Sequence, residues 1–321
     1  ISGSTVATTA AVGGIMIPEM KQRNYNTAYA ATVAAAGGVM GVIIPPSVSM
    51  VIYSGISGTS LTGLFMAGIP VGILMGISLI IVCYVIAKKK GYTGRTEKIG
   101  MKRALKDIKD ALWALGAPVI MVGGIIGGVF TPTEAAVVAI IYGIVVSIFI
   151  YKELKFRDLY KIFLNSMVTS AKITFIMANA AVLGWVMAAE QIPQQIFQLL
   201  TAISSNPDVI LLIINIILLI AGCFMETGAL LTIITPILMP IVVALGWNPI
   251  HFGVMMILNL AIGNLTPPLR VCIYTGAMVA GCRVEEVAVK VLPFLAALLI
   301  VLFMVAYIPE ISMFLPKLLM K

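Results

Sequence analysis

Long apolar segments separated by short polar segments make up most of this chain of 321 residues. Apolar runs near or above the roughly 18 residues that mark a membrane span are separated by short polar loops. The segments expected to cross are 29–53, 64–87, 117–130, 133–151, 166–189, 208–224, 230–244, 250–276 and 291–308. A first apolar segment ends near Ile17, segment 101–113 has the spacing of an amphipathic surface helix, and 190–206 is expected to be a loop. The pattern predicts an all-α polytopic membrane protein.

Two parts of the chain, 222 residues apart, carry the same interruptions in otherwise apolar sequence. Thr5, Pro18, Asn26, Gly41, Pro45 and Pro46 in the first part recur as Thr227, Pro240, Asn248, Gly263, Pro267 and Pro268 in the second. The apolar residues between them match only loosely, so the repeated feature is the position of the backbone breaks. A duplicated pair of broken hydrophobic segments is typical of the substrate and ion site of a secondary transporter.

Composition agrees with a membrane protein and argues against a nucleic-acid partner. The chain is 60% hydrophobic and 11% charged, whereas soluble domains carry about 25% charged residues. Nine of its 21 basic residues lie between Lys88 and Lys109, beside an apolar segment, so the net charge of +8 indicates topology. No basic stripe with interleaved aromatic residues is present. The four cysteines lack C-x-x-C spacing and are expected to be buried free thiols.

The loop charges indicate that the two repeated parts enter the membrane from opposite faces. Lys21 and Arg23 occupy the first matched loop, while the equivalent loop at 246–249 has no basic residue. Because basic loops stay in the cytoplasm, this difference predicts an inverted repeat. The segments around Glu226 are either two full spans or a re-entrant hairpin, and the polar tip favours the hairpin. The predicted fold therefore has inverted repeats with two re-entrant helical hairpins and two Pro-broken helices.

These features divide the chain into four predicted parts. Residues 1–60 form the first half of a transport domain, with a hairpin arm and a broken helix, and residues 61–206 supply scaffold helices with amphipathic surface segments. Residues 207–282 form the second half of the transport domain, and 283–321 a C-terminal scaffold helix. By the repeat offset, the partner arm of the first hairpin is expected before Ile1.

Each Pro-Pro pair removes two backbone donors and frees the carbonyl groups before it. Together with nearby hydroxyl groups, these carbonyls offer the oxygen ligands that a hard cation such as Na⁺ prefers; the hydroxyls belong to Ser4, Thr5, Thr227 and Thr266. Half-helices that begin near Ser47 and Leu269 point positive dipole ends at the same region, which suits a carboxylate. The alternative is that the prolines only kink long helices. Glu226 either ligates a cation or holds the tip by hydrogen bonds.

With these residues in place, the chain resembles the large membrane subunit of the tripartite ATP-independent periplasmic (TRAP) transporters. The resemblance runs from the first residue nearly to the last. It is carried by residues 2–7 (SGSTVA), 44–47 (IPPS), 64–68 (LFMAG), 131–135 (TPTEA), 235–240 (TPILMP), 251–253 (HFG) and 266–268 (TPP).

The resemblance implies an elevator-type mechanism and two sets of site residues. The implied Na⁺ ligands are Ser2, Ser4, Thr5, Gly41 and Ile44 in the first part and Met225, Glu226, Thr227, Gly263 and Thr266 in the second. The implied substrate-binding residues are Ser4, Pro46, Ser47, Thr227, Thr266, Pro268 and Arg270. The family usually has glycine shortly after the second Pro-Pro pair, where this chain has Leu269 and Arg270. Three interpretations of Arg270 are open: it binds a substrate carboxylate, it forms a structural ion pair, or it indicates a different substrate.

The function implied is Na⁺-coupled uptake of an organic acid, namely sialic acid, another sugar acid or a C4-dicarboxylate. The implied partners are a periplasmic substrate-binding protein and a small four-helix membrane subunit, separate or fused, in the lipid bilayer of the bacterial inner membrane. The alternative is a binding-protein-independent dicarboxylate/Na⁺ symporter of related hairpin architecture. An intramembrane enzyme is disfavoured, because the chain has one His and no H-E-x-x-H motif. A channel is disfavoured because duplicated broken hairpins are typical of alternating access.

Overall fold

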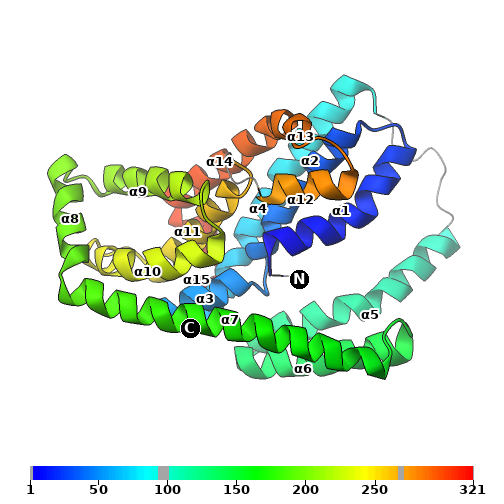
Figure 1. Cartoon of the computed structure of the whole chain (residues 1–321), viewed down its shortest axis with the longest axis horizontal. Coiled ribbons are helices and arrows are strands. Elements are labelled where there is room, and N and C mark those ends of the chain that lie inside the picture. Colours follow the sequence, from blue (N-terminus) through cyan, green and yellow to red (C-terminus); the bar gives the residue numbers. More distant parts are fainter. Residues whose placement is uncertain (1–2, 93–100, 267–270, 321) are drawn as a thin grey trace. The chain divides into compact units, whose positions relative to one another are not determined.

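The computed structural model describes residues 3–92, 101–266 and 271–320, and for residues 101–110 the backbone alone. All regular secondary structure within these ranges is helical (Figure 1). The chain divides into two compact units, one made of Ile1–Gly94 with Ala180–Lys321 and the other of Arg95–Asn179. The four-part division predicted from the sequence stays a prediction.

The first unit contains the repeated parts of the sequence. Its N-terminal helices are α1 (Thr5–Gln22), α2 (Thr27–Gly38), the 3-10 turn η1 (Val39–Val42), α3 (Val48–Ser57) and α4 (Leu61–Lys90). Its later helices are α8 (Ile192–Ile203), α9 (Pro207–Gly222), α10 (Thr227–Ala244), α11 (Pro249–Gly263), α12 (Val271–Ala280), α13 (Val284–Lys290), α14 (Leu292–Tyr307) and α15 (Pro309–Leu319).

The second unit consists of α5 (Met101–Ile126), α6 (Pro132–Val145), the π-helical turn η2 (Val146–Ile150) and most of α7 (Phe156–Ala189). The start of α6 is a capping box, in which Thr131 N donates to Glu134 Oε2 at 2.8 Å and Glu134 N donates to Thr131 Oγ1 at 3.3 Å. Helices α5 and α6 pack together where the Tyr142 ring lies against Gly116 and its hydroxyl donates to Trp113 O at 2.8 Å.

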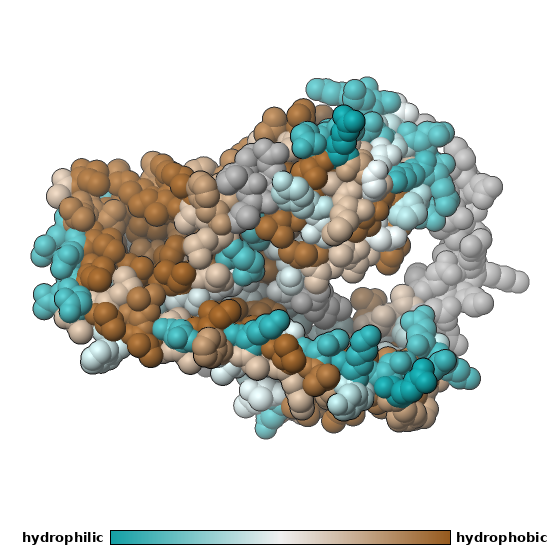
Figure 2. Space-filling view, in the orientation of Figure 1, coloured by the Kyte–Doolittle hydropathy of each residue, from teal (hydrophilic) through white to brown (hydrophobic). Residues whose placement is uncertain are grey.

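Several helices are long and apolar enough to cross a membrane. Among the described residues these are Leu61–Lys90, Pro132–Ile150, Phe156–Ala189 and Thr227–Ala244. Two further pairs, α8 with α9 and α13 with α14, reach the required length only together and are bent by 117° and 50°. Figure 2 shows the matching surface, where hydrophobic side chains cover α9 and α10. By length and composition, the described chain therefore has four to six possible spans.

Helices α1 and α10 match at both ends across the repeat, and helices α2 and α11 match at their starts. Helix α1 starts at Thr5 and ends at Gln22, and α10 starts at Thr227 and ends at Ala244, 222 residues later at both ends. Helices α2 and α11 start 222 residues apart after Asn26 and Asn248, whose side chains accept from Tyr29 N at 3.1 Å and from Ile250 N at 2.9 Å. The helix order is thus the same in both parts, although α2 ends at Gly38 and is followed by η1, whereas α11 continues to Gly263.

The packing between the two parts is reciprocal. Helix α1 packs against α2 of its own part and α12 of the other, while α10 packs against α11 of its own part and α3 of the other. Helices α1 and α10 therefore each contact a short helix of the other repeated part. In Figure 1, α1 and α12 lie side by side.

Four expectations about the elements were wrong. Segment 190–206 contains helix α8 in place of a loop, because apolar residues at helical spacing pack it against α10. The separate surface helix at 101–113 and span at 117–130 form one continuous helix, α5, with Pro118 inside it. The first segment continues past Ile17 to Gln22. Segment 291–308 is not the last element of the chain, because helix α15 follows it and packs against α4.

Candidate functional site

The residues just before α1, Gly3 and Ser4 (the first tip), lie against residues 41–48 around the end of η1 and the start of α3 (the first break). Ser4 is the N-cap of α1, and a Cβ atom placed on Gly41 would lie 3.0 Å from Ser4 O. A Cβ on Gly3, which has a φ of +65°, would lie 2.9 Å from Val48 N and 3.4 Å from Pro46 O. Only glycine permits this close approach. The sequence-predicted residues Ser4, Thr5 and Gly41 are therefore adjacent.

The residues between α9 and α10 (223–226, the second tip) lie near the residues after α11 (264–266, the second break), and here the end of α9 makes the close contact. Gly263 at the end of α11 meets Gly222 at the end of α9, where a Cβ on Gly263 would lie 2.6 to 2.7 Å from the Gly222 main chain. Thr266 Oγ1 donates to Gly263 O at 2.7 Å and lies 3.0 Å from Cys223 Sγ. All four cysteines are free, but the expectation that they are buried holds for Cys272 alone. Cys223 is partly exposed at this tip.

Asn264 joins the two parts, and the sequence prediction missed it. Its Nδ2 donates to Thr5 Oγ1 at 3.2 Å and to Thr227 Oγ1 at 3.1 Å. These threonines occupy matching positions in the repeat, and each is the first residue of its helix. All three side chains are at most 3% exposed. The available signal was an amide at the end of an apolar helix, three residues before a Pro-Pro pair.

Residues of the first break are mostly engaged in holding its shape. Ser47 is buried, donates its hydroxyl to Val42 O at 2.6 Å and accepts from Met50 N at 3.3 Å as the N-cap of α3. Ile44 is 41% exposed, and part of its side chain lies close to Gly72 of α4. Pro46 is partly exposed beside Gly3. The predicted substrate residue Ser47 therefore already uses its hydroxyl within the break.

Glu226 holds the second tip by hydrogen bonds. Its Oε2 accepts from Gly228 N at 2.8 Å and from Ala229 N at 3.2 Å, so that the carboxylate caps the first turn of α10. The carboxylate also suits the positive end of that helix. Met225, beside it in the tip, is 39% exposed. The predicted residues Ser2, Pro268 and Arg270 lie outside the described residues.

The site offers hydroxyl, amide and main-chain oxygen atoms. Among the described residues there is no group of three or more His, Cys, Asp or Glu side chains that could hold a metal ion. Helices α1 and α10 begin at the tips and present positive dipole ends there, while η1 and α11 end at the breaks and present negative ends. Oxygen ligands and negative helix ends suit a hard cation, and positive helix ends suit an anion.

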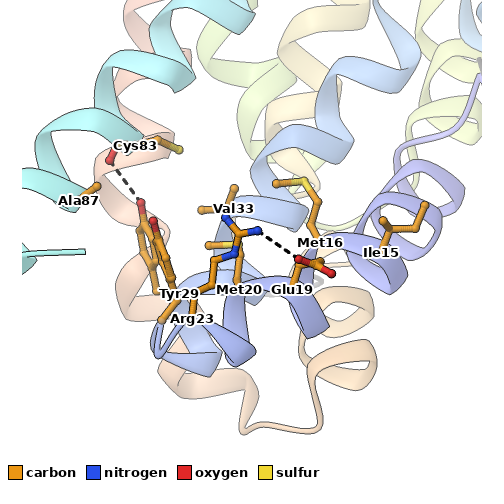
Figure 3. Close-up of a pocket in the computed structure, with 10 residues that line it drawn as sticks. Ile15, Met16, Glu19, Met20, Arg23, Tyr29, Val33, Cys83 and Ala87 are labelled. Atoms are coloured by element: carbon orange, nitrogen blue, oxygen red, sulfur yellow. Dashed lines mark hydrogen bonds and ion pairs between the residues drawn. The ribbon is translucent and has the colours of Figure 1, made fainter. Parts of the chain in front are cut away.

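A cavity of about 470 Å³ lies elsewhere, between the C-terminal half of α1, the start of α2 and the end of α4 (Figure 3). Arg23 pairs with Glu19 at 3.3 Å beside it, and Tyr29 Oη donates to Cys83 O at 3.5 Å. None of the predicted ion or substrate residues lines it. The matching positions on α10, among them Leu238, Ile241 and Val242, are buried. We therefore do not assign this cavity to the substrate.

Comparison with known proteins identifies the family. The model of the "Tripartite ATP-independent periplasmic transporter, DctM component" family matches residues 1–311. The chain is 41% identical over 314 residues to the isethionate TRAP transporter permease protein DctMQ of Oleidesulfovibrio alaskensis, covering 98% of this chain and 49% of that protein. It is 40% identical to the C4-dicarboxylate large permease protein DctM of Pseudomonas aeruginosa and 39% identical to the sialic acid large permease protein SiaM of Vibrio cholerae.

Each of these last two matches covers 99% of this chain and 74% of the relative. The chain thus spans half of the first relative and about three quarters of the other two. The relatives are named as transporter permeases, not enzymes. Together with the apolar helices, the full-length family match identifies a multi-pass integral membrane protein that belongs to the DctM component family of the TRAP transporters.

Proposed function

We propose that this protein is the large permease subunit for Na⁺-coupled uptake of an organic acid, and that the two tips and two breaks form its ion and substrate site. The observation that carries the proposal is the junction at Asn264, where the first residues of α1 and α10 meet the end of α11. A single buried point thus connects both hairpin arms with a broken helix.

The proposed repeat is inverted. The matching helix boundaries and the reciprocal packing of α1 on α12 and α10 on α3 support a two-fold relation between the parts. The contrast between Lys21 and Arg23 in one loop and no basic residue at 246–249 in the other supports opposite orientations. An inverted repeat supplies the two related states that alternating access needs, and sliding of the tips and breaks against a scaffold would carry the site across.

The proposed Na⁺ ligands are oxygen atoms at each tip and its own break. Thr5 with the main chain near Gly41 would serve the first ion, and Thr227 and Thr266 with the main chain near Gly263 the second. Na⁺ prefers such oxygen donors over nitrogen or sulfur. The negative dipole ends of η1 and α11 at the breaks add to the attraction.

The proposed substrate is a small organic acid bound between the tips. The relatives' names include isethionate, C4-dicarboxylate, sialic acid and 2,3-diketo-L-gulonate, which share an acid group. The positive ends of α1 and α10 at the tips suit that group. The acid group is a sulfonate in isethionate and a carboxylate in the others, so the proposal stops at the class of small organic anions.

The proposed partners follow from the family. A TRAP permease works with a periplasmic binding protein that delivers substrate and with a small membrane subunit. The relative DctMQ is about twice as long as this chain, which agrees with a fused small subunit in that protein. The proposed location is the bacterial inner membrane, where a periplasmic partner can reach the outer face.

Uptake by the reconstituted complex tests the proposal. Proteoliposomes holding the permease and small subunit are given sialic acid or a C4-dicarboxylate with its binding protein, under an inward Na⁺ gradient or in K⁺ alone. We expect uptake to fall by about tenfold or more when Na⁺ is removed. Equal uptake in K⁺ would overturn the Na⁺ coupling. Full uptake without the binding protein would favour the symporter alternative.

Replacing Thr227 by Ala should weaken the response to Na⁺. The change removes one hydroxyl ligand, and a loss of about 1.4 kcal/mol raises the Na⁺ concentration for half-maximal uptake by about tenfold. Thr232→Ala is the matched control, because Thr232 lies in the same helix and its hydroxyl donates only to Ala229 O, at 2.7 Å. Thermal unfolding measured for both variants separates ion binding from folding. Equal Na⁺ responses in the two variants would contradict a role for Thr227.

A further inference from the structure

One amide group lies between the two proposed ion sites. The Asn264 Nδ2 donates to Thr5 Oγ1 at 3.2 Å and to Thr227 Oγ1 at 3.1 Å, with all three side chains buried. The repeat does not provide two such groups, because the position that matches Asn264 in the first part is the apolar Val42. Both threonines are therefore positioned by the same residue.

The main chain of Asn264 holds a third element. Its carbonyl oxygen accepts from Cys272 N at 3.3 Å, in the first turn of α12. Asn264 thus connects the starts of α1, α10 and α12, the three helices that begin at the two tips and after the second break. A shift of any one of them changes the geometry at the other two.

A carboxamide has two N–H donors, and here each is directed at one threonine. A hydroxyl that accepts one of these bonds has its remaining lone pair held in a fixed direction. When a cation draws one hydroxyl oxygen toward itself, the planar amide either follows or loses that bond. Either response alters the hydroxyl on the other side.

We propose that Asn264 is a positioning residue that couples the two Na⁺ sites, so that an ion at one tip changes the affinity for Na⁺ at the other. This inference rests on the proposed function. Coupling between sites is reciprocal, and typical values change affinity by about fivefold or more. The cycle would then favour loading of both ions together over transport with one ion bound.

A double-mutant cycle tests the coupling without requiring turnover. In the complete permease complex with Cys83 and Cys282 replaced by Ser, N-ethylmaleimide labels Cys223 at the second tip, because Cys272 is fully buried. The measured quantity is the Na⁺ concentration that halves the labelling rate, and Cys223→Ser confirms the labelled position. Thr5→Ala removes a ligand of the first site only. When residue 264 is Asn, we expect Thr5→Ala to raise the Na⁺ concentration that halves the labelling rate by about fivefold. In the Asn264→Ala background, we expect the same change to raise it by less than about twofold.

The possible results are distinct. An equal shift by Thr5→Ala in both backgrounds would overturn the coupling while the proposed function stands. No effect of Na⁺ on Cys223 labelling in the unmutated site would overturn both. If Asn264→Ala lowers the yield of folded protein, Asn264→Leu repeats the cycle, because it keeps a side chain of similar size and removes the N–H donors without adding a charge beside the ion sites. Steeper-than-linear Na⁺ activation of uptake should also flatten in Asn264→Leu, which a purely structural role would not cause.

Discussion

Replacing Gly263 by Ala is expected to lower the free energy of unfolding by about 1–3 kcal/mol and so to lower the melting temperature. The added Cβ would lie 2.6 Å from the carbonyl carbon and 2.7 Å from the Cα and carbonyl oxygen of Gly222. These are main-chain atoms within the α9–α11 contact, so no flexible side chain can move aside. Small residues at such crossings let membrane helices pack closely. Overpacking typically costs about 1–3 kcal/mol, a large part of a total stability of about 5–15 kcal/mol.

Thermal unfolding and yield of the purified protein measure this effect. Gly37→Ala is the matched control, since a Cβ on Gly37 in α2 would meet no atom within 4 Å. That substitution should leave stability unchanged or raise it by about 0.5–1 kcal/mol, because alanine loses less backbone freedom in a helix. Equal melting temperatures for the two variants would contradict the close approach of α9 and α11.

Replacing Asn259 by Leu is expected to destabilise the same contact by about 1–3 kcal/mol. Asn259 Nδ2 donates to Asn215 O at 2.9 Å and to Asn215 Oδ1 at 2.8 Å, and both residues are fully buried. The change leaves the Asn215 side chain without this donor in an apolar contact. A buried polar group that loses its partner carries the full cost of its desolvation.

The double variant Asn215→Leu with Asn259→Leu should recover most of that loss, because replacing both partners by apolar groups is nearly neutral. Asn259 Oδ1 has no hydrogen-bond partner in the described structure, so the pair is not fully satisfied even before the change. The melting temperatures of the single and double variants give the comparison. A double variant that is less stable than Asn259→Leu alone would show that the amides stabilise the contact in another way.

The fold could be predicted where polar residues interrupt apolar sequence. Asn26 and Asn248 occupy matching positions in the repeat, and they are the N-caps of α2 and α11. The Pro-Pro pair at residues 45 and 46 marked the gap between η1 and α3. Such signals act locally, through a missing donor or a side-chain cap, so the sequence alone contains them.

Elements that depend on packing were harder to predict. The sequence indicates a loop at 190–206, a segment without Lys or Arg between two apolar segments, whereas the structure has helix α8 there, which packs against α10. Helix α5 was divided at a change from polar to apolar sequence, but no break in the backbone accompanies that change. Pro118 within it shows that proline alone does not end a helix here.

The centre of the candidate site was predictable only in part. Thr5 and Thr227 stand out because they match across the repeat. Asn264 does not, since its counterpart is Val42 and a comparison of shared positions passes over it. A residue that joins two related halves has no reason to occur in both. Its importance follows from the distances in the folded chain, 3.2 and 3.1 Å, and not from the pattern.

The central claim is that the tips and breaks bind Na⁺, and labelling of Cys223 tests it most directly. Cys223 Sγ lies 3.0 Å from Thr266 Oγ1 at the second tip and is partly exposed. With Cys83 and Cys282 replaced, the rate of N-ethylmaleimide labelling is measured in Na⁺ and in K⁺ at equal ionic strength. We predict that Na⁺ slows the labelling by about tenfold at saturation, because the bound ion orders the tip around this thiol. Equal rates in Na⁺ and K⁺ would contradict the account.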